Sequence, residues 1–285
     1  MSARHRQNSG RTPREGTDTF QHQARKRFGQ NFLHDEHIIA RIVKAITPQA
    51  GQKLIEIGPG QGAITGPLLS VTDQLSVIEI DRDLAAHLRT RFGHLPGFEL
   101  IESDVLQIDF ARFGTAPASL RILGNLPYNI STPLLFHLLQ YHSLIHDMVF
   151  MLQLEVVNRM AATPGDPDYG RLSIMMQYHC KVERLFKVPP GAFTPAPKVD
   201  SAIVRLEPWT TLPHPVRNEK VFAGIVRDAF NQRRKTIRNA LKLHVTPEQW
   251  EQLGLNPDLR PENLALADYA RIADIVDQAN NTREQ

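Results

Sequence analysis

The tetrapeptide Asn125-Leu126-Pro127-Tyr128 combines residue types that can hold a planar ring carrying an amino group. Asn125 offers a side-chain carbonyl as an acceptor, and Tyr128 offers a flat aromatic face for stacking. Pro127 favours an extended backbone at Leu126, which can aim the Leu126 carbonyl at the same amine, and the Pro127 carbonyl is the alternative. Two acceptors on the two N–H groups favour a nitrogen lone pair that points outward, toward an electrophile. The tetrapeptide therefore suits group transfer to an aromatic amine, and a structural turn with a capping asparagine is the alternative.

The tetrapeptide lies between a predicted strand and a predicted helix. Residues 120–124 form a short apolar run that is typical of a buried strand, and residues 134–139 are apolar again. Thr132 as the cap and Pro133 as the first helical residue predict where this helix begins. In open α/β sheets, ligands bind at the carboxyl ends of the strands. The tetrapeptide is therefore predicted to lie where a ligand would bind, as group transfer to an aromatic amine requires.

An earlier predicted strand, residues 53–57, ends in a glycine turn. The turn reads Gly58-Pro59-Gly60-Gln61-Gly62, and a helix is predicted to follow it over residues 63–69. A strand, a glycine turn and a helix in this order are typical of nucleotide-binding units, and a purely structural turn is the alternative. The glycine spacing is tighter than the dinucleotide fingerprint, and Glu56 would repel a pyrophosphate. An NAD-dependent dehydrogenase is therefore disfavoured.

Two further predicted strands, 75–81 and 98–101, end in acidic residues. Glu79 follows Gly58 by about 20 residues, where a carboxylate in a βαβ unit binds ribose hydroxyls. Asp104 follows the second of these strands and can accept from an adenine amino group, with a surface turn as the alternative. Asp81 and Asp83 can instead cap the next helix. Four strand ends in this order predict an adenosine site beside an acceptor site.

The composition of the 285 residues, 41% hydrophobic and 22% charged, is typical of a globular protein. No apolar run approaches the ~18 residues of a membrane-spanning helix, and the polar, basic N-terminus is unlike a secretory signal. The single cysteine, Cys180, excludes an internal disulfide and fits the reducing cytoplasm. His34 and His37 have no further ligands near them in sequence, so no metal site is expected.

Basic residues gather in two clusters, although the net charge of the chain is only +3. Residues 1–30 contain seven Lys or Arg against two acidic residues, and residues 226–242 contain six against one. Two such clusters favour a polyanion, with nucleic acid as the expected partner and a solvated surface as the alternative. The expected nucleic-acid contacts, which include one lysine of a proline-rich loop, are Arg25, Lys26, Arg27, Lys198, Arg233, Arg234 and Lys235.

Changes in composition divide the chain into three predicted parts. Residues 1–23 have few apolar side chains and are expected to be a disordered basic tail. Residues 24–208 alternate between strands and helices, with later strands at residues 148–152, 184–188 and 202–206. Residues 209–285 start with a proline-rich linker and continue with helical patterns. We expect an α/β domain followed by a small all-helical C-terminal domain.

Five motifs together resemble those of the ribosomal RNA adenine dimethyltransferases, in particular the bacterial small-subunit type. They are Phe28-Gly29-Gln30-Asn31-Phe32-Leu33, Glu56-Ile57-Gly58-Pro59-Gly60, Asn125-Leu126-Pro127-Tyr128-Asn129-Ile130, Phe193-Thr194-Pro195-Ala196-Pro197-Lys198-Val199-Asp200-Ser201 and Asn231-Gln232-Arg233-Arg234-Lys235. The resemblance implies a Rossmann-like class I methyltransferase fold with a seven-stranded, mostly parallel sheet containing one antiparallel strand. The long basic N-terminal tail departs from the compact start of this family.

The resemblance also implies a reaction and its site residues. S-adenosylmethionine would be the methyl donor, and the reaction would be N6,N6-dimethylation of two adjacent adenosines in the 3′-terminal hairpin of 16S rRNA. The substrate would be this RNA within the 30S subunit, and the protein would also have a role in small-subunit biogenesis. A cytoplasmic monomer without metal is expected. The donor site would contain Asn31, Leu33, Gly58, Glu79, Asp104 and Asn125. The target base would meet Asn125, Leu126, Pro127 and Tyr128, with Phe193 as a second stacking face.

Two alternatives compete with this reading. DNA adenine and protein amide methyltransferases use a similar tetrapeptide, usually with proline at its second position, so Leu126 favours RNA. A non-enzymatic alternative is a ribosome assembly factor that binds the immature small subunit with little turnover. The number and order of the methyl transfers follow from the resemblance and not from the residues themselves.

Overall fold

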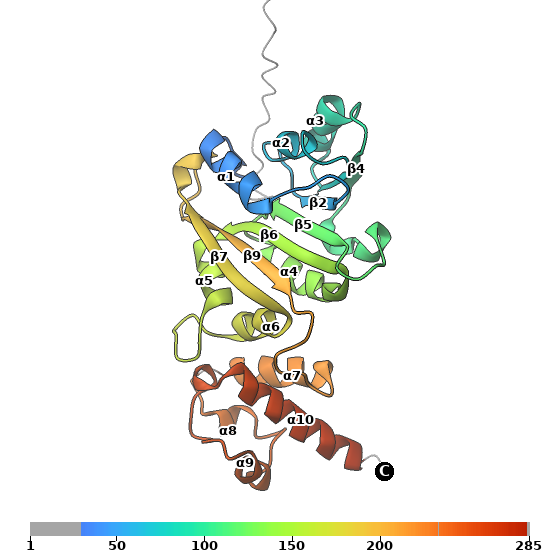
Figure 1. Ribbon diagram of the computed structural model, residues 1–285. Coiled ribbons are helices and arrows are strands. Elements are labelled where there is room, and N and C mark those ends of the chain that lie inside the picture. Colours follow the sequence, from blue (N-terminus) through green and yellow to red (C-terminus); the bar gives the residue numbers. More distant parts are fainter. Residues whose placement is uncertain (1–29, 233, 284–285) are drawn as a thin grey trace, which may run out of the picture.

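The computed structural model describes residues 30–232 and 234–283, which are built around one seven-stranded sheet (Figure 1). The strands lie in the order β4-β3-β2-β5-β6-β9-β7. Their bounds are β2 (Lys53–Ile57), β3 (Leu75–Glu79), β4 (Phe98–Glu102), β5 (Leu120–Asn125), β6 (Ile145–Gln153), β7 (Cys180–Val188) and β9 (Ser201–Pro208). Strands β2 to β6 pair in parallel, whereas β9 is antiparallel to both of its neighbours. The predicted mostly parallel sheet with one antiparallel strand is confirmed.

Helices cover both faces of this sheet, and a two-stranded sheet lies beside it. The α-helices are α1 (Glu36–Ile46), α2 (Thr65–Leu69), α3 (Arg82–Phe92), α4 (Ser131–Leu139), α5 (Leu154–Ala161), α6 (Arg171–His179), α7 (Glu219–Phe230), α8 (Ile237–Ala240), α9 (Pro247–Leu253) and α10 (Leu266–Arg283). Short 3-10 turns include η2 (Val105–Gln107), η3 (Phe110–Phe113) and η5 (Pro190–Ala192). The small antiparallel sheet pairs β1 (Phe32–Leu33) with β8 (Phe193–Thr194).

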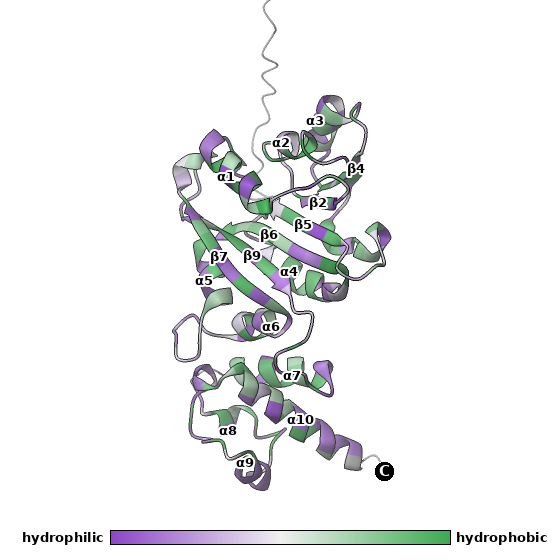
Figure 2. Ribbon diagram, viewed as in Figure 1, coloured by the Kyte–Doolittle hydropathy of each residue, from purple (hydrophilic) through white to green (hydrophobic). Residues whose placement is uncertain are grey.

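Two hydrophobic cores form because successive residues of a strand point to opposite faces. On β5, Ile122 belongs to the core beneath α4 and α6, whereas Leu123 belongs to the core beneath α1 and α2. On β6, Phe150 and Val149 divide between the same two cores. Hydrophobic residues make up most of the central strands β5 and β6, while hydrophilic residues lie on α1 and α9 and interrupt the edge strand β7 (Figure 2). The central strands are therefore held from both faces.

Two predicted boundaries near the site are wrong. Helix α4 begins at Ser131 and not at Pro133, so Thr132 is inside the first turn and is not the cap. The Ser131 hydroxyl donates to the carbonyls of Pro127 and Tyr128, which starts the helix directly after the tetrapeptide. Strand β7 begins at Cys180, four residues before the predicted start, because it pairs with β9 along its whole length.

The C-terminal helices pack against α6 through aromatic side chains. The rings of Tyr178 and Phe222 have centroids 4.5 Å apart, and Phe230 contacts both Tyr169 and Tyr269. Strand β9 ends at Pro208, where the sequence predicts the domain boundary, but one hydrophobic core continues across it. The division into domains at residues 24–208 and 209–285 therefore stays a prediction.

The predicted tail at residues 1–23 lies outside the described residues. Within residues 30–232 and 234–283, no helix combines the length and the apolar composition that crossing a membrane requires.

Gly124 of β5 is the position in the sheet where a side chain is least tolerable. A Cβ atom there would lie 2.3 Å from the carbonyl oxygen of Ile57 on β2. We expect Gly124→Ala to lower the free energy of unfolding by ~1–3 kcal/mol, since the strands must separate locally. Gly191→Ala is the matched control, because no atom lies within 4 Å of a Cβ at that position. Urea unfolding measures both variants, and equal midpoints would contradict the packing argument.

Candidate active site

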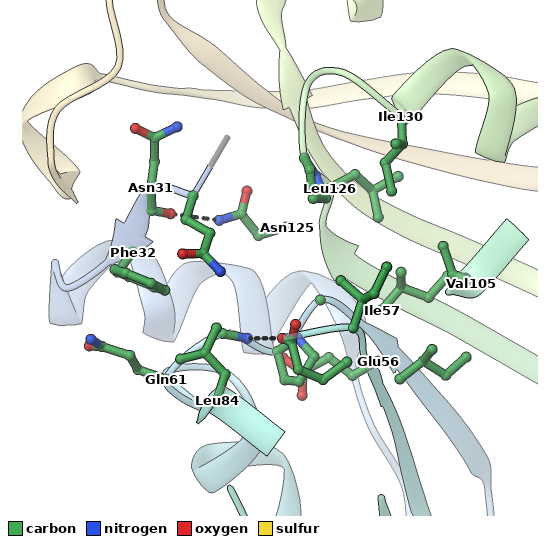
Figure 3. A pocket seen from close by; sticks show the side chains of 18 of the residues that line it. Asn31, Phe32, Glu56, Ile57, Gln61, Leu84, Val105, Asn125, Leu126 and Ile130 are labelled. Atoms are coloured by element: carbon green, nitrogen blue, oxygen red, sulfur yellow. Dashed lines mark hydrogen bonds between the residues drawn. The ribbon is translucent and has the colours of Figure 1, made fainter. Parts of the chain in front are cut away.

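The carboxyl ends of β2, β3 and β5 open into one cavity of about 330 Å³ (Figure 3). Residues before α1 form another of its walls. Nine residues predicted for the donor and acceptor sites line this cavity: Asn31, Leu33, Gly58, Glu79, Asp104, Asn125, Leu126, Pro127 and Tyr128. The fold thus brings together residues that are up to 97 positions apart in the chain (from Asn31 to Tyr128).

The side-chain amide of Asn125 has a fixed orientation. Its Nδ2 donates to the backbone carbonyl of Asn31 at 3.2 Å, which Figure 3 shows as a dashed line. A carbonyl can only accept, so the nitrogen must be the end of the amide that faces Asn31. The Oδ1 atom at the other end is then available as an acceptor inside the cavity. This is the role that the sequence predicts for Asn125.

The two backbone carbonyls that follow Asn125 differ in their partners. The Pro127 carbonyl already accepts from the Ile130 N–H at 3.1 Å and from the Ser131 hydroxyl at 3.0 Å. In the part of the chain that the structure describes, no group donates to the Leu126 carbonyl, while the Leu126 N–H donates to Met151. Of the two carbonyls that the sequence allows as the second acceptor, the structure favours Leu126.

Tyr128 is held by its hydroxyl. The Oη atom lies 2.8 Å from the Oγ of Ser201, the first residue of β9. Burial raises the pKa of Tyr128, so the phenol stays neutral at physiological pH. The ring is half-buried and lines the cavity, as a stacking face requires.

Phe193 does not present an open stacking face in this structure. Its side chain is only 3% exposed and packs in the core that also contains Leu33 and Val188. The cause is the pairing of β8 with β1, which places Phe193 opposite Leu33. A base would reach this ring only after its neighbours move, so stacking on Phe193 stays a prediction.

The glycine turn approaches its neighbours closely. Gly60 has a φ of 59°, and a Cβ atom there would lie 3.3 Å from the Phe32 ring. Its backbone N–H donates to Glu79 Oε2 at 3.3 Å, while Glu79 Oε1 accepts from Asp81. The turn therefore brings backbone to the cavity wall and fixes the carboxylate at the end of β3.

Two carboxyl groups lie buried beside the cavity. Glu56 is 2% exposed and accepts from the Thr65 hydroxyl at 2.6 Å. The pKa of Glu56 is raised to about 7. Burial is the main cause, the nearby Glu79 charge also raises the pKa, and the Thr65 hydrogen bond partly opposes both. Burial also raises the pKa of Glu79 to about 7, against the effect of its backbone hydrogen bonds. Carboxylates in this state favour a cation near them.

The acidic residues at the next strand ends have divided roles. Asp81 caps α3 by accepting from Asp83 N–H, and its second oxygen accepts from Gln30 at 3.1 Å. The capping alternative is thus confirmed for Asp81. Asp104 caps η2 with Oδ1, and no described group donates to its Oδ2. Asp104 therefore keeps an acceptor for a ligand.

Sequence reasoning missed several residues of the cavity wall. Gln30 lies beside Asp81, and Ile80, which is 47% exposed at the end of β3, is an apolar side chain among acids. A large aliphatic residue directly after Glu79 is the signal that could have identified Ile80. Ile57 and Val105 add further apolar surface (Figure 3), as a planar ring requires.

The predicted RNA contacts are only partly described. Lys198, Arg234 and Lys235 are exposed, on the β8–β9 loop and in the turn before α8. Arg25, Lys26, Arg27 and Arg233 lie outside the described residues. Among residues 30–232 and 234–283, no three His, Cys, Asp or Glu side chains gather as metal ligands would.

A comparison with protein families identifies this arrangement. Residues 21–278 match the family model described as ribosomal RNA adenine dimethylase. The chain belongs to the ribosomal RNA adenine dimethylase family. The Asn-Leu-Pro-Tyr turn after β5 and the glycine turn after β2 are thus parts of a protein of this family.

Relatives of this dimethylase match it over nearly their whole length. The ribosomal RNA small subunit methyltransferase A of Pseudomonas savastanoi pv. phaseolicola is 58% identical over 262 residues, 92% of this chain and 98% of the relative. The protein of the same name from Marinobacter nauticus is 59% identical over 255 residues, 90% of this chain and 92% of the relative.

Two solved structures resemble the dimethylase in fold. A dimethyladenosine transferase from Plasmodium falciparum has a TM-score of 0.72 and 26% identity, covering 87% of this chain and 98% of that chain. The 23S rRNA methyltransferase ErmE has a TM-score of 0.67 and 26% identity, covering 87% of this chain and 100% of that chain.

The raised pKa of Glu56 predicts a pH-dependent stability. Because the folded chain holds this proton up to about pH 7 and the unfolded chain only to about 4.5, the wild type loses stability as the pH rises between these values. Glu56→Gln stays neutral and escapes this loss. We expect the variant to gain about 3 kcal/mol relative to the wild type between about pH 5 and about pH 8.

Urea unfolding of the ligand-free proteins at both pH values measures this difference. Glu251→Gln is the control, because Glu251 is exposed on α9. A Glu56→Gln difference that does not change with pH would show that Glu56 titrates normally.

Proposed function

We propose that this protein transfers methyl groups from S-adenosylmethionine to the N6 atoms of two adjacent adenosines in the 3′-terminal hairpin of small-subunit ribosomal RNA. The observation that carries the proposal is the fixed amide of Asn125, whose Oδ1 is the acceptor end, beside an apolar cavity of adenosine size. The family and the names of the small-subunit relatives support the substrate.

The residues of the cavity fit the donor. Its lining is apolar around Ile57, Ile80 and Val105, which suits an adenine ring. Asp104 keeps one acceptor for an adenine amino group, and Glu79 lies where ribose hydroxyls are bound. The buried Glu56 and Glu79 carboxyls favour a positively charged ligand. When bound, S-adenosylmethionine supplies a methyl group on a positively charged sulfur.

The acceptor side needs positioning rather than a strong base. Asn125 Oδ1 and the Leu126 carbonyl would accept the two N–H groups of the adenine, which directs the nitrogen lone pair outward. Tyr128, anchored to Ser201, would stack on the ring. The adenosine must leave its base stack to reach these groups, at a cost of a few kcal/mol. Stacking on the aromatic ring returns ~1–3 kcal/mol per base.

The chain would meet its RNA within the 30S subunit, in the cytoplasm, and act as a monomer. Lys198, Arg234 and Lys235 are exposed cations suited to phosphate contacts. A role in small-subunit biogenesis would accompany the methylation. Methylation of DNA adenine is the second enzymatic reading, and the small-subunit relatives favour RNA.

The direct test is transfer of tritium from labelled S-adenosylmethionine to small subunits from a strain that lacks this gene. Nuclease mapping should find the label in two adjacent dimethyladenosines near the 3′ end of the RNA. Tight binding to the subunits without transfer would instead indicate an assembly factor, and label in DNA would indicate the second reading.

Asn125→Ala should abolish most of the transfer. Removing one preorganised polar group from the reacting centre costs roughly 10²–10³ in kcat. Single-turnover transfer to the same subunits measures this loss, with S-adenosylhomocysteine binding measured in parallel. Asn158→Ala on α5 is the control, because Asn158 does not line the cavity and its side chain accepts a hydrogen bond from Arg184 on β7. Full turnover in a folded Asn125→Ala variant would remove Asn125 from the mechanism.

The exposed cations should determine how steeply RNA binding depends on salt. Each substitution that removes a phosphate-binding cation at Lys198, Arg234 or Lys235 should reduce the slope of log K against log salt by ~1. Glutamine variants of each, titrated with an RNA hairpin at several salt concentrations, test this expectation. Arg112→Gln is the control, since Arg112 is an exposed cation on η3 that already pairs with Glu99 at 3.9 Å and does not line the cavity. An unchanged slope in all three variants would contradict the assignment.

A further inference from the structure

Arg121 lies on β5, the strand that ends at Asn125, and its side chain is buried. All five N–H donors of its guanidinium have an acceptor. Nε and one NH2 donate to the two carboxylate oxygens of Asp147 on β6, at 2.7 and 2.8 Å. The remaining three donate to Gln52 Oε1 and to the carbonyls of Ile46 and Thr47, at 2.7, 2.6 and 3.2 Å. The guanidinium is therefore saturated, and two of its bonds reach the end of α1.

Those two carbonyls are the C-terminus of α1, where helices leave carbonyls unpaired and carry partial negative charge. Thr47 caps the helix with a φ of 48°, a left-handed conformation that a β-branched residue rarely adopts. Arg205 of β9 donates to the carbonyl of Ala45 one residue earlier. The C-terminal end of α1 is thus attached to two central strands by arginine side chains.

The other end of α1 carries the segment that covers the donor cavity. Residues 30–35, here called the strap, run directly into α1 at Glu36. The first two strap residues line the cavity and bond to residues at the ends of β3 and β5: Gln30 donates to Asp81, and Asn31 accepts from Asn125. Leu33 pairs with Phe193, and His34 donates to Ala192 at 3.0 Å. The strap is therefore held by these contacts and, at its other end, by the position of α1 along the sheet.

We propose that Arg121 is a positioning residue for the donor: it holds α1 in place and thereby keeps the strap, with the Asn31 carbonyl, against Asn125. This inference rests on the proposed methyl transfer. Arg121 touches neither the cavity nor Asn125, and it acts through an 11-residue helix. A role limited to stability would lower the free energy of unfolding and leave donor affinity unchanged, so the two roles are distinguishable.

The first test variant is the double substitution Arg121→Met and Asp147→Leu. Replacing both members of a buried ion pair with apolar residues often preserves folding stability, whereas removing one leaves an unpaired charge. We expect the dissociation constant for S-adenosylhomocysteine and the KM for the donor to rise ~10-fold. We also expect kcat at saturating donor to fall, because the Asn31 carbonyl would no longer fix the Asn125 amide. Amide hydrogen exchange over residues 32–46 should become faster.

The matched control is the double substitution Arg159→Met and Glu155→Leu. This pair has the same kinds of charge in contact, at 2.6 Å on α5, and it is exposed. It should change neither donor binding nor exchange over residues 32–46.

Arg121→Lys is the second variant, in case the double variant does not fold. Lysine keeps the charge beside Asp147, but it is a point charge with three donors and cannot reach all five acceptors. It should weaken donor binding and accelerate exchange in α1 in the same direction. A folded variant of either kind with wild-type donor affinity would overturn the proposal. Absence of transfer by the wild type would instead refute the proposed function, and donor binding and exchange would still report on Arg121.

Discussion

The hydrogen bond from the Asn125 side chain to the Asn31 carbonyl determines which end of that amide faces the cavity. A primary amide is a donor at one end and an acceptor at the other, and the chemistry of an aromatic amine requires the acceptor. If Asn31 moved away, nothing else described near Asn125 would fix that choice. The segment before α1, far from Asn125 in sequence, therefore belongs to the proposed reacting centre.

The sheet explains why these residues meet. Parallel strands β2, β3 and β5 end at one edge, and Gly124 lets β5 lie close to the Ile57 carbonyl just before the tetrapeptide begins. Beyond that edge the carbonyls of Leu126 and Pro127 differ in their hydrogen bonds. The Pro127 carbonyl accepts from the Ile130 N–H and the Ser131 hydroxyl at the start of α4. The same helix start leaves the Leu126 carbonyl without a described donor, as the proposed second acceptor requires. Secondary structure and chemistry are thus determined by the same few hydrogen bonds.

The electrostatics of the cavity add a second constraint. Glu56 and Glu79 are buried carboxyl groups, and their raised pKa values mean that burial destabilises their charged forms. A cationic ligand removes part of that penalty. Burial of these two carboxyl groups therefore lowers the folding stability, and the same groups would favour binding of a cationic ligand. Ionisable groups with perturbed pKa values are common at functional sites.

Much of this could be predicted from the sequence. The apolar runs at residues 53–57 and 120–124 predict strands, and the glycines and acids that follow them predict the site, because the carboxyl ends of parallel strands share one edge. The start of α4 was mispredicted, because Ser131 bonds back to the tetrapeptide, a contact that capping rules do not contain. The burial of Phe193 was missed as well, since it depends on pairing between two-residue strands that are 161 positions apart (from Phe32 to Phe193). The five bonds of Arg121 join three segments that are distant in sequence, residues 46–52, 121 and 147, and no local pattern identifies them.

The most direct test of this account is a crystal structure of the protein with S-adenosylhomocysteine and an RNA hairpin that carries the target adenosines. The account predicts that Asn125 Nδ2 still donates to the Asn31 carbonyl while Asn125 Oδ1 and the Leu126 carbonyl accept from the adenine N6. An adenine bound elsewhere, or an Asn125 amide rotated so that its nitrogen faces the base, would contradict it.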